Sequence, residues 1–144
     1  MAGGSLEIED AVRIVREAAG ALQSVHGELW PSAILVEGND VRVEPPTATD
    51  RLRYGQYAAP ERVLGKPATP QSDVFSLGAI LYHAVAGRPP FRGDSPAAVM
   101  LSICTDQALD APPDVPPSVA ALIRRCLMRD PAERFASPAV LRDA

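Results

Sequence analysis

Several residue types that mark particular protein classes are scarce in this chain of 144 residues. Two cysteines, Cys104 and Cys126, are too few for a disulfide framework and lack the spacing of metal ligands. With two histidines and neither a CxxC nor an HExxH pattern, we expect no metal site. Lys66 is the only lysine, and the 14 basic residues form no stripe, so nucleic acid is not an expected partner.

Long apolar runs are missing as well. No stretch of 18 apolar residues occurs, so we expect no membrane span. Residues 1–5 lack the basic and apolar regions of a signal peptide, and we interpret them as an extension of a cytoplasmic protein. The net charge of −4 and a hydrophobic content of 47% are typical of a globular chain, and the length allows one domain with one modest core.

Proline is abundant, with 15 residues that include four adjacent pairs. Each pair excludes a helix interior or a central strand at its position, so the pairs divide the chain into segments. Residues 72–86 are apolar nearly all round, which predicts a helix in the middle of the domain. Apolar spacing and capping residues predict further helices, with Ser5 as the first N-cap, over 6–25, 96–106, 118–128 and 137–143.

Residues 33–44 form a predicted β-hairpin. Two short β-branched runs flank Glu37-Gly38-Asn39, which supplies the turn. A two-stranded hairpin is marginal alone, so it must pack on the helices. The expected fold is therefore mainly α with one small hairpin.

Four motifs follow one another along the second half of the chain. They are Tyr57-Ala58-Ala59-Pro60-Glu61, Asp73-Val74-Phe75-Ser76-Leu77-Gly78, Gly87-Arg88-Pro89-Pro90-Phe91 and the run from Cys126 to Phe135. In order and spacing they resemble the C-terminal lobe of the bacterial Hanks-type Ser/Thr protein kinases, whose pattern is Y-x-A-P-E, S-D-x-x-S-x-G, G-x-x-P-F and C-L-x-x-D-P-x-x-R. The resemblance extends over nearly the whole chain and implies a kinase-like C-lobe over residues 6–144.

The resemblance implies structural roles for three charged residues. Glu61 is expected to form a buried ion pair with Arg134, and Asp73 is expected to accept backbone N–H bonds from the catalytic loop. Alternatively, Glu61 and Arg134 are unrelated surface charges, and Asp73 is a favourable charge at a helix N-terminus.

The catalytic motifs of the family are degenerate in this sequence. The catalytic loop H-R-D-L-K-P-x-N corresponds to residues 26–33, which places Glu28 at the position of the base and Ala33 at that of the metal-binding Asn. In a second register, His26 is only the end of the preceding helix. The metal-binding D-F-G corresponds to Glu44-Pro45-Pro46, and the activation-like segment 45–61 is short.

The family's ATP-binding elements are also missing from the sequence. No G-x-G-x-x-G occurs, and Lys66 lies far from the place of the family's strand Lys, so we expect the N-terminal ATP lobe to be absent. The sequence therefore predicts no catalytic residue, and no ATP or Mg²⁺ cofactor, in the chain alone.

Two functional hypotheses follow from the resemblance. The first is an inactive kinase-like module that binds a protein, such as a Ser/Thr kinase, through an apolar patch formed by Trp30, Ile34, Val36 and Val43; alternatively, the hairpin folds down and covers this patch. Thr47 and Thr49 are candidate phosphosites for a phosphothreonine-reading domain, or ordinary loop residues.

The second hypothesis is an enzyme, half of a split kinase completed by a separate N-lobe with ATP and Mg²⁺. A decayed gene product is a further alternative, but the apolar patterning is intact throughout the chain.

Overall fold

The computed structural model describes residues 7–22, 24–27, 29–38, 40–45 and 55–144. The described part is mainly helical with one small antiparallel sheet, which confirms the predicted fold class. The elements in chain order are α1 (Ile8–Ala21), η1 (Pro31–Ala33), β1 (Ile34–Glu37), β2 (Asp40–Val43), α3 (Pro60–Val63), α4 (Pro70–Ala86), α5 (Pro96–Thr105), α6 (Pro117–Cys126), η2 (Pro131–Glu133) and α7 (Pro138–Asp143).

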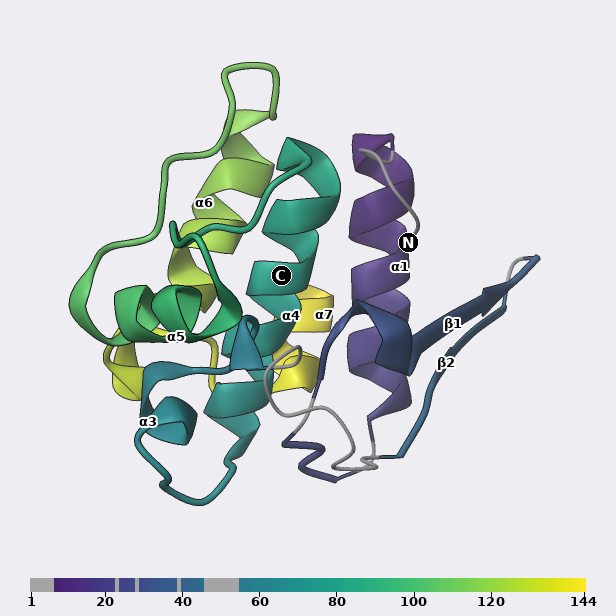
Figure 1. The fold of residues 1–144 in the computed structure, drawn as a ribbon. Helices are drawn as coiled ribbons and strands as arrows, with labels where there is room; N and C mark the ends of the chain where they lie inside the picture. Colours follow the sequence, from purple (N-terminus) through teal and green to yellow (C-terminus); the bar gives the residue numbers. More distant parts are fainter. Residues whose placement is uncertain (1–6, 23, 28, 39, 46–54) are drawn as a thin grey trace.

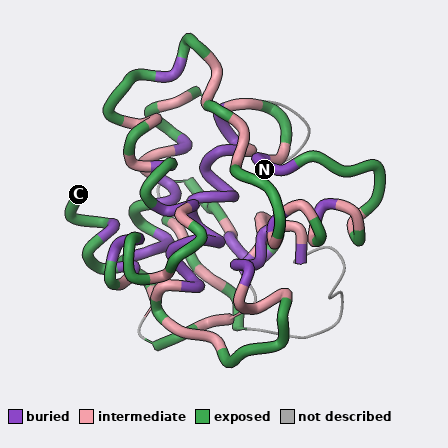
Figure 2. The backbone as a smooth tube through the Cα atoms, turned by 90° about the vertical axis from the view of Figure 1, so that its left-hand side faces the viewer, coloured by how far each residue is buried: buried purple, intermediate pink, exposed green. Residues whose placement is uncertain are grey.

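Helix α4 is the centre of the molecule. Every residue from Ser72 to Tyr82 is buried, and α4 packs against α1, α6 and α7 (Figure 1). Figure 2 shows the buried stretches of backbone gathered in the middle and the exposed ones in the outer loops. An all-round apolar helix can lie only where neighbours cover every face, as the sequence predicted for this segment.

The start of α4 lies earlier than the sequence analysis placed it. The helix begins at Pro70, because the Thr69 hydroxyl accepts the Ser72 N–H and the Ser72 hydroxyl accepts the Thr69 N–H. This capping box followed by Pro at the first helical position is a strong start signal. The helix ends as predicted at Gly87, whose φ of 74° is the left-handed conformation that glycine adopts readily.

Helix α1 is shorter than predicted, and its end is the main correction to the expected elements. It ends at Ala21 rather than at residue 25, with Leu22 in an extended conformation. The N–H groups of His26 and Gly27 are taken by Asp73, so they are not available for helical bonds. At the other end the cap is Glu7, and the predicted cap Ser5 lies outside the described residues.

The other helices differ from their predicted bounds by one or two residues. Helix α5 ends at Thr105 instead of residue 106, α6 spans Pro117–Cys126 instead of 118–128, and α7 starts at Pro138 behind its N-cap Ser137. Helix α6 stops early because the N–H of Leu127 turns back toward the last carbonyls of the helix.

Strands β1 and β2 form the predicted hairpin. Ile34 pairs with Val43 and Val36 with Val41, so these four apolar side chains share one face. Strand β2 packs against α1 while the far end of the hairpin projects from the body (Figure 1). None of the helices in the described ranges is long and apolar enough to cross a bilayer.

Candidate functional site

The carboxylate of Asp73 holds the loop that follows α1. The His26 N–H donates to its Oδ2 at 2.7 Å and the Gly27 N–H donates to its Oδ1 at 2.9 Å. The side chain lies at the start of α4 and is only 1% exposed. One buried carboxylate therefore fixes two successive backbone amides of a loop that lacks regular secondary structure of its own.

The ionisation of Asp73 reflects two opposing effects. Burial raises the pKa of this carboxyl, and the N–H bonds from His26 and Gly27 lower it by stabilising the charged form. The positive charge of Arg62 also lowers the pKa of Asp73. The Nε atom of Arg62 is buried and has no hydrogen-bond partner in the described part of the chain, although its NH1 group donates to the Lys66 carbonyl at 2.8 Å.

A second anchor joins α3 to the segment around η2. The Arg134 guanidinium donates from NH1 to Oε2 of Glu61 at 2.7 Å and from NH2 to Oε1 at 2.9 Å. The Arg134 side chain is 0% exposed and that of Glu61 12%. Three carbonyls accept the remaining guanidinium bonds, those of Met128, Gln71 and Arg129. The pair is thus fully hydrogen-bonded, which is the condition under which a buried ion pair is tolerated.

A third contact links the segment before α3 to the end of α4. The Tyr57 hydroxyl lies 2.9 Å from Nδ1 of His83, and the two rings are stacked with centroids 6.0 Å apart. Burial raises the pKa of Tyr57 and lowers that of His83, so both groups are neutral near pH 7. In the tautomer of neutral His83 that is protonated at Nε2, Nδ1 accepts a hydrogen bond from the Tyr57 hydroxyl.

The loop after α1 also meets the end of β2. Nε2 of His26 lies 2.6 Å from the carbonyl oxygen of Glu44, and because that oxygen can only accept, Nε2 donates. The Glu44 N–H donates to the Ala33 carbonyl at 2.8 Å. His26, Ala33 and Glu44 therefore lie together although 18 residues separate the first from the last.

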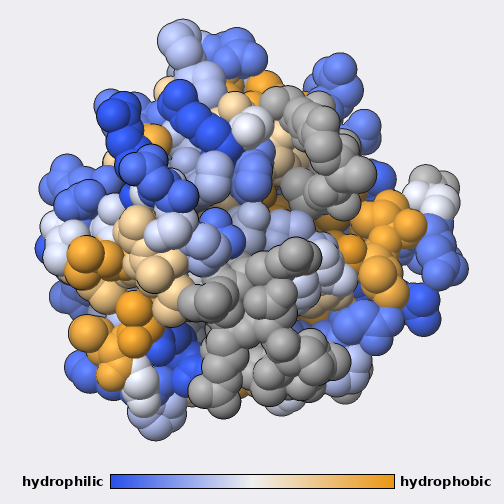
Figure 3. Space-filling model, in the orientation of Figure 1, coloured by the Kyte–Doolittle hydropathy of each residue, from blue (hydrophilic) through white to orange (hydrophobic). Residues whose placement is uncertain are grey.

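The apolar face of the hairpin is covered at its base and open at its far end. Ile34 is 5% exposed, so it belongs to the core and is not available to a partner. Trp30 and Val43 are half-buried, and Val36 is 43% exposed. The expected patch is thus reduced to the outer part of the hairpin, where Figure 3 shows apolar surface on the hairpin side of the molecule.

Comparison with known proteins identifies the family. The family model described as "Protein kinase domain" matches residues 38–144 of this chain. The chain belongs to the protein kinase family. It is 34% identical to the serine/threonine-protein kinase PknA of Mycobacterium tuberculosis over 98% of this chain and 37% of that protein. It is 37% identical to the serine/threonine-protein kinase PknB of Mycolicibacterium smegmatis over 96% of this chain and 26% of that protein.

The chain spans 37% of the length of PknA and 26% of that of PknB. The alignment with PknA covers 160 positions, more than the 144 residues of this chain, so PknA has residues between the matched segments that this kinase-family chain lacks. The short activation-like segment 45–61 is one place where the sequence pattern puts such a deletion.

In this kinase-family chain, the geometry around Asp73 favours the first of the two registers considered for His26. Helix α1 ends four residues before Val25, so His26 is not its last residue. The amides of His26 and Gly27 instead bind Asp73, as the family pattern expects of the catalytic loop. The resemblance places Ala33 and Glu44 at the positions of the family's metal-binding Asn and Asp, and the structure shows that the two residues are hydrogen-bonded neighbours.

These residues do not fit the magnesium ions that a kinase needs. Mg²⁺ takes oxygen ligands in octahedral geometry, and the Ala33 side chain offers none. Glu44 is a lone carboxylate, and in the described ranges no group of three His, Cys, Asp or Glu side chains is placed to hold a metal ion.

Some candidate residues lie outside the described part of the chain. These are Glu28, which the resemblance places at the position of the catalytic base, and the candidate phosphosites Thr47 and Thr49.

Cys126 is a packing residue. It is 0% exposed, and burial raises the pKa of its thiol to about 12, which disfavours a nucleophilic thiolate near pH 7.

Sequence reasoning missed two features of this region. The Tyr57–His83 contact joins a motif residue to His83, which lies outside the four motifs, so the sequence pattern did not pair them. A cavity between α4, α5 and α6 was missed as well, because its lining residues come from separate segments that meet only in the folded chain.

Proposed function

We propose that this chain is a catalytically inactive kinase-like module that binds a protein partner. The observation that carries the proposal is the pair Ala33 and Glu44. The resemblance places these residues at the positions of the two metal ligands, and a backbone hydrogen bond of 2.8 Å joins them. Their side chains supply one carboxylate, from Glu44, and no side-chain amide like that of the family's Asn. The scaffold around them, held by Asp73 and by Glu61 with Arg134, keeps its hydrogen bonds.

The binding surface we propose is the outer hairpin face. Val36 is exposed and Val41, Val43 and Trp30 are half-buried, so a partner can cover apolar area there without unfolding the core. Among the described residues, the two strands pair only with each other, so no described strand covers the outer edge of either one, and a further strand could add there. By the family resemblance this surface faces the N-terminal lobe of a kinase. We therefore propose a Ser/Thr kinase, through its N-lobe, as the partner.

The experiment mixes this chain with a separately expressed N-lobe of PknA, with ATP and Mg²⁺. Binding is followed by calorimetry and phosphoryl transfer by incorporation of radioactive phosphate. We expect binding without incorporation. Failure to bind would overturn the proposed partner, and incorporation would overturn the inactive reading.

A matched pair of variants locates the surface. Val36→Glu places a charge on the outer hairpin face and is expected to weaken N-lobe binding at least about tenfold, as burial of an unpaired charge does. Leu64→Glu changes a residue that is 68% exposed near α3, and it is expected to leave the affinity unchanged. Because both sites are exposed, neither variant is expected to lower the melting temperature. Equal effects of the two variants would contradict the assignment of the hairpin.

A split kinase is the second candidate function. It is favoured by the intact C-lobe anchors and by the 37% of PknA that the chain spans, since an N-lobe from another chain would complete the fold. A partner lobe would not replace the side chains missing at Ala33. The mixture of this chain with the PknA N-lobe, ATP and Mg²⁺ also tests this alternative. Phosphate incorporation in that mixture, and its loss when Glu44→Gln replaces the wild-type chain, would establish it.

The phosphosite proposal concerns Thr47 and Thr49. Arg51 and Arg53 follow them in the sequence and could pair with a phosphate, or a phosphothreonine-reading domain could bind the modified segment. Mass spectrometry of the protein from its native cells tests this. Finding both threonines unmodified would contradict it.

A further inference from the structure

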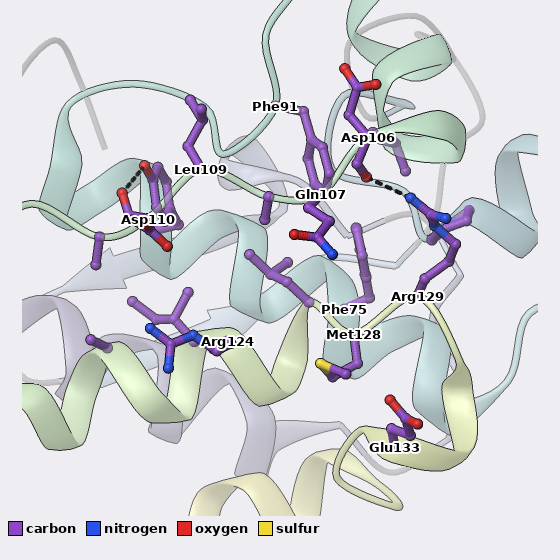
Figure 4. A pocket seen from close by; sticks show the side chains of 18 of the residues that line it. Phe75, Phe91, Asp106, Gln107, Leu109, Asp110, Arg124, Met128, Arg129 and Glu133 are labelled. Carbon is purple, nitrogen blue, oxygen red and sulfur yellow. Dashed lines mark hydrogen bonds between the residues drawn. The ribbon is translucent and has the colours of Figure 1, made fainter.

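A cavity lies between α4, α5 and α6, away from the loop that Asp73 holds. Its volume is about 410 Å³, within the range of sites that hold small ligands or peptide side chains. Three helices contribute fully buried lining residues, which we call the floor: Phe75 and Tyr82 of α4, Ile103 of α5 and Ile123 of α6. Phe75 is labelled in Figure 4. All four floor residues are at most 3% exposed, so the floor belongs to the permanent core.

The roof of the cavity is the segment 106–111, and it is tied to the body at three points. The Tyr82 hydroxyl donates to the Asp110 carbonyl at 2.9 Å, and the Leu109 N–H donates to the Pro90 carbonyl at 2.8 Å. The Arg129 guanidinium donates to the Asp106 carbonyl at 2.9 Å (Figure 4). The space beneath the roof is therefore preformed, and a ligand need not order the segment to enter.

The interior of the cavity is apolar and aromatic. The rings of Phe75 and Phe91 are stacked with centroids 6.0 Å apart, and Leu109, Leu127 and Met128 continue the apolar lining. Binding of one bulky apolar side chain in this lining is favourable, because each Å² of apolar surface removed from water contributes about 25 cal/mol.

The charges around the cavity are unbalanced. The lining residues include four acidic ones, Asp106, Asp110, Asp130 and Glu133, and two basic ones, Arg124 and Arg129. Figure 4 shows the Asp106 carboxylate turned away from the cavity, which leaves three acidic side chains against two basic ones. The side chains of Asp110 and Glu133 form no ion pair or hydrogen bond with any described residue, and Figure 4 shows them toward opposite ends of the cavity. The excess of negative charge favours a cationic ligand over an anionic one.

We infer that this cavity is a peptide-binding site for a segment with a bulky apolar side chain flanked by Arg or Lys. The apolar side chain enters between Phe75, Leu109 and Ile123, and the flanking cations meet the carboxylates at the two ends. This site is separate from the hairpin surface, and the inference does not depend on whether the chain is an active kinase.

The test uses a blocked heptapeptide with Phe at its centre and two arginines on each side. Binding is measured on the full chain by calorimetry and by the shifts of the backbone amide signals of Gln107, Leu109, Ile123 and Met128. We expect these amides to move. Replacing the central Phe of the peptide by Ser is expected to weaken binding about tenfold or more, which is the usual cost of truncating an anchor. A peptide with Glu in place of its arginines is expected to bind more weakly still.

Variants of two adjacent alanines provide the matched control. Ala120 lines the cavity and Ala121, the next residue of α6, is exposed and does not. Ala120→Met fills the space and is expected to reduce the affinity at least about tenfold, whereas Ala121→Met leaves it unchanged. In case Ala120→Met perturbs folding, Glu133→Gln on the exposed rim gives a second test, with an affinity loss that shrinks as salt is added.

The inference is overturned if the Phe peptide moves none of the four amides. It is also overturned if the Ser peptide binds equally well, because attraction between charges alone would then explain the binding. Stronger binding of the Glu-flanked peptide would contradict the assigned charge of the ligand.

Discussion

Single residues that join distant segments define this fold. Asp73, Glu61 with Arg134, and Tyr57 with His83 each bring together parts of the chain that lie between 26 and 73 residues apart. Two of the contacts link α4 to a loop, namely residues 26–27 and the segment before α3. The third contact links α3 to the segment after η2. The strength of each is accessible to single substitutions.

The buried ion pair gives the first prediction. Glu61→Gln leaves the Arg134 guanidinium, which is 0% exposed, without its counter-charge, and it is expected to lower the free energy of unfolding by ~3–5 kcal/mol. Urea denaturation measures this value. Arg13→Gln, which breaks an exposed pair with Glu17, is the control and is expected to cost no more than ~0.5 kcal/mol. Equal effects of the two substitutions would show that the Glu61–Arg134 pair is not buried in solution.

The second prediction concerns pH. Burial lowers the pKa of His83, so the folded chain resists protonation of this ring more than the unfolded chain does. The unfolded state then binds more protons as the pH falls below about 6.5, the ordinary pKa of histidine, and the free energy of unfolding decreases. The His83→Gln variant is expected to lose part of this decrease between pH 7.5 and pH 5.

All other titratable groups are common to both proteins, so the difference between the wild type and His83→Gln isolates His83. Urea denaturation at several pH values measures this difference. A wild type and variant with the same pH dependence would contradict the buried, neutral His83 beside Tyr57.

At the scale of elements, the sequence predicted most of what apolar periodicity and capping determine. The central helix was evident because Val74 to Val85 is apolar on every side, and the hairpin because a turn sequence separates two β-branched runs. The end of α1 at Ala21 was not evident, and the loop that follows it is held by Asp73, nearly 50 residues further along. The cavity could not be predicted either, because its walls meet only after the helices pack.

The close approach of α4 and α6 gives a prediction for an element. A methyl group at Gly78 would overlap the Cβ of Cys126, which lies on the facing side of α6. We expect Gly78→Ala to destabilise the fold by ~1–3 kcal/mol, as overpacking does, although alanine favours helices more than glycine. Thermal and urea unfolding measure the effect.

Gly20→Ala is the matched control. Gly20 is also helical, but a methyl group there meets only the flexible side chain of Arg142, at 3.1 Å. It is expected to leave the stability unchanged or to raise it by up to ~1 kcal/mol. A Gly78→Ala variant as stable as the wild type would mean that α4 and α6 lie further apart than described.

At the scale of the whole molecule, an intact scaffold surrounds an altered site. The anchors expected from the kinase family form the hydrogen bonds described above, and the helical core is continuous. Ala33 and Glu44, which the resemblance places at the positions of the family's metal ligands, are hydrogen-bonded neighbours, and the Ala33 side chain offers no ligand atom. The same substitutions were evident in the sequence, because the family motifs supply the register. The proximity of His26, Ala33 and Glu44 required the structure.

Thermal unfolding with and without Mg-ATP tests the central claim most directly. A ligand at one hundred times its dissociation constant stabilises a protein by ~2.7 kcal/mol, which raises the melting temperature of a domain of this size by several degrees. The account predicts one cooperative transition whose midpoint Mg-ATP does not move. A rise of several degrees that requires Mg²⁺ would contradict it, because a nucleotide site would then persist without the ligands that Ala33 and Glu44 replace.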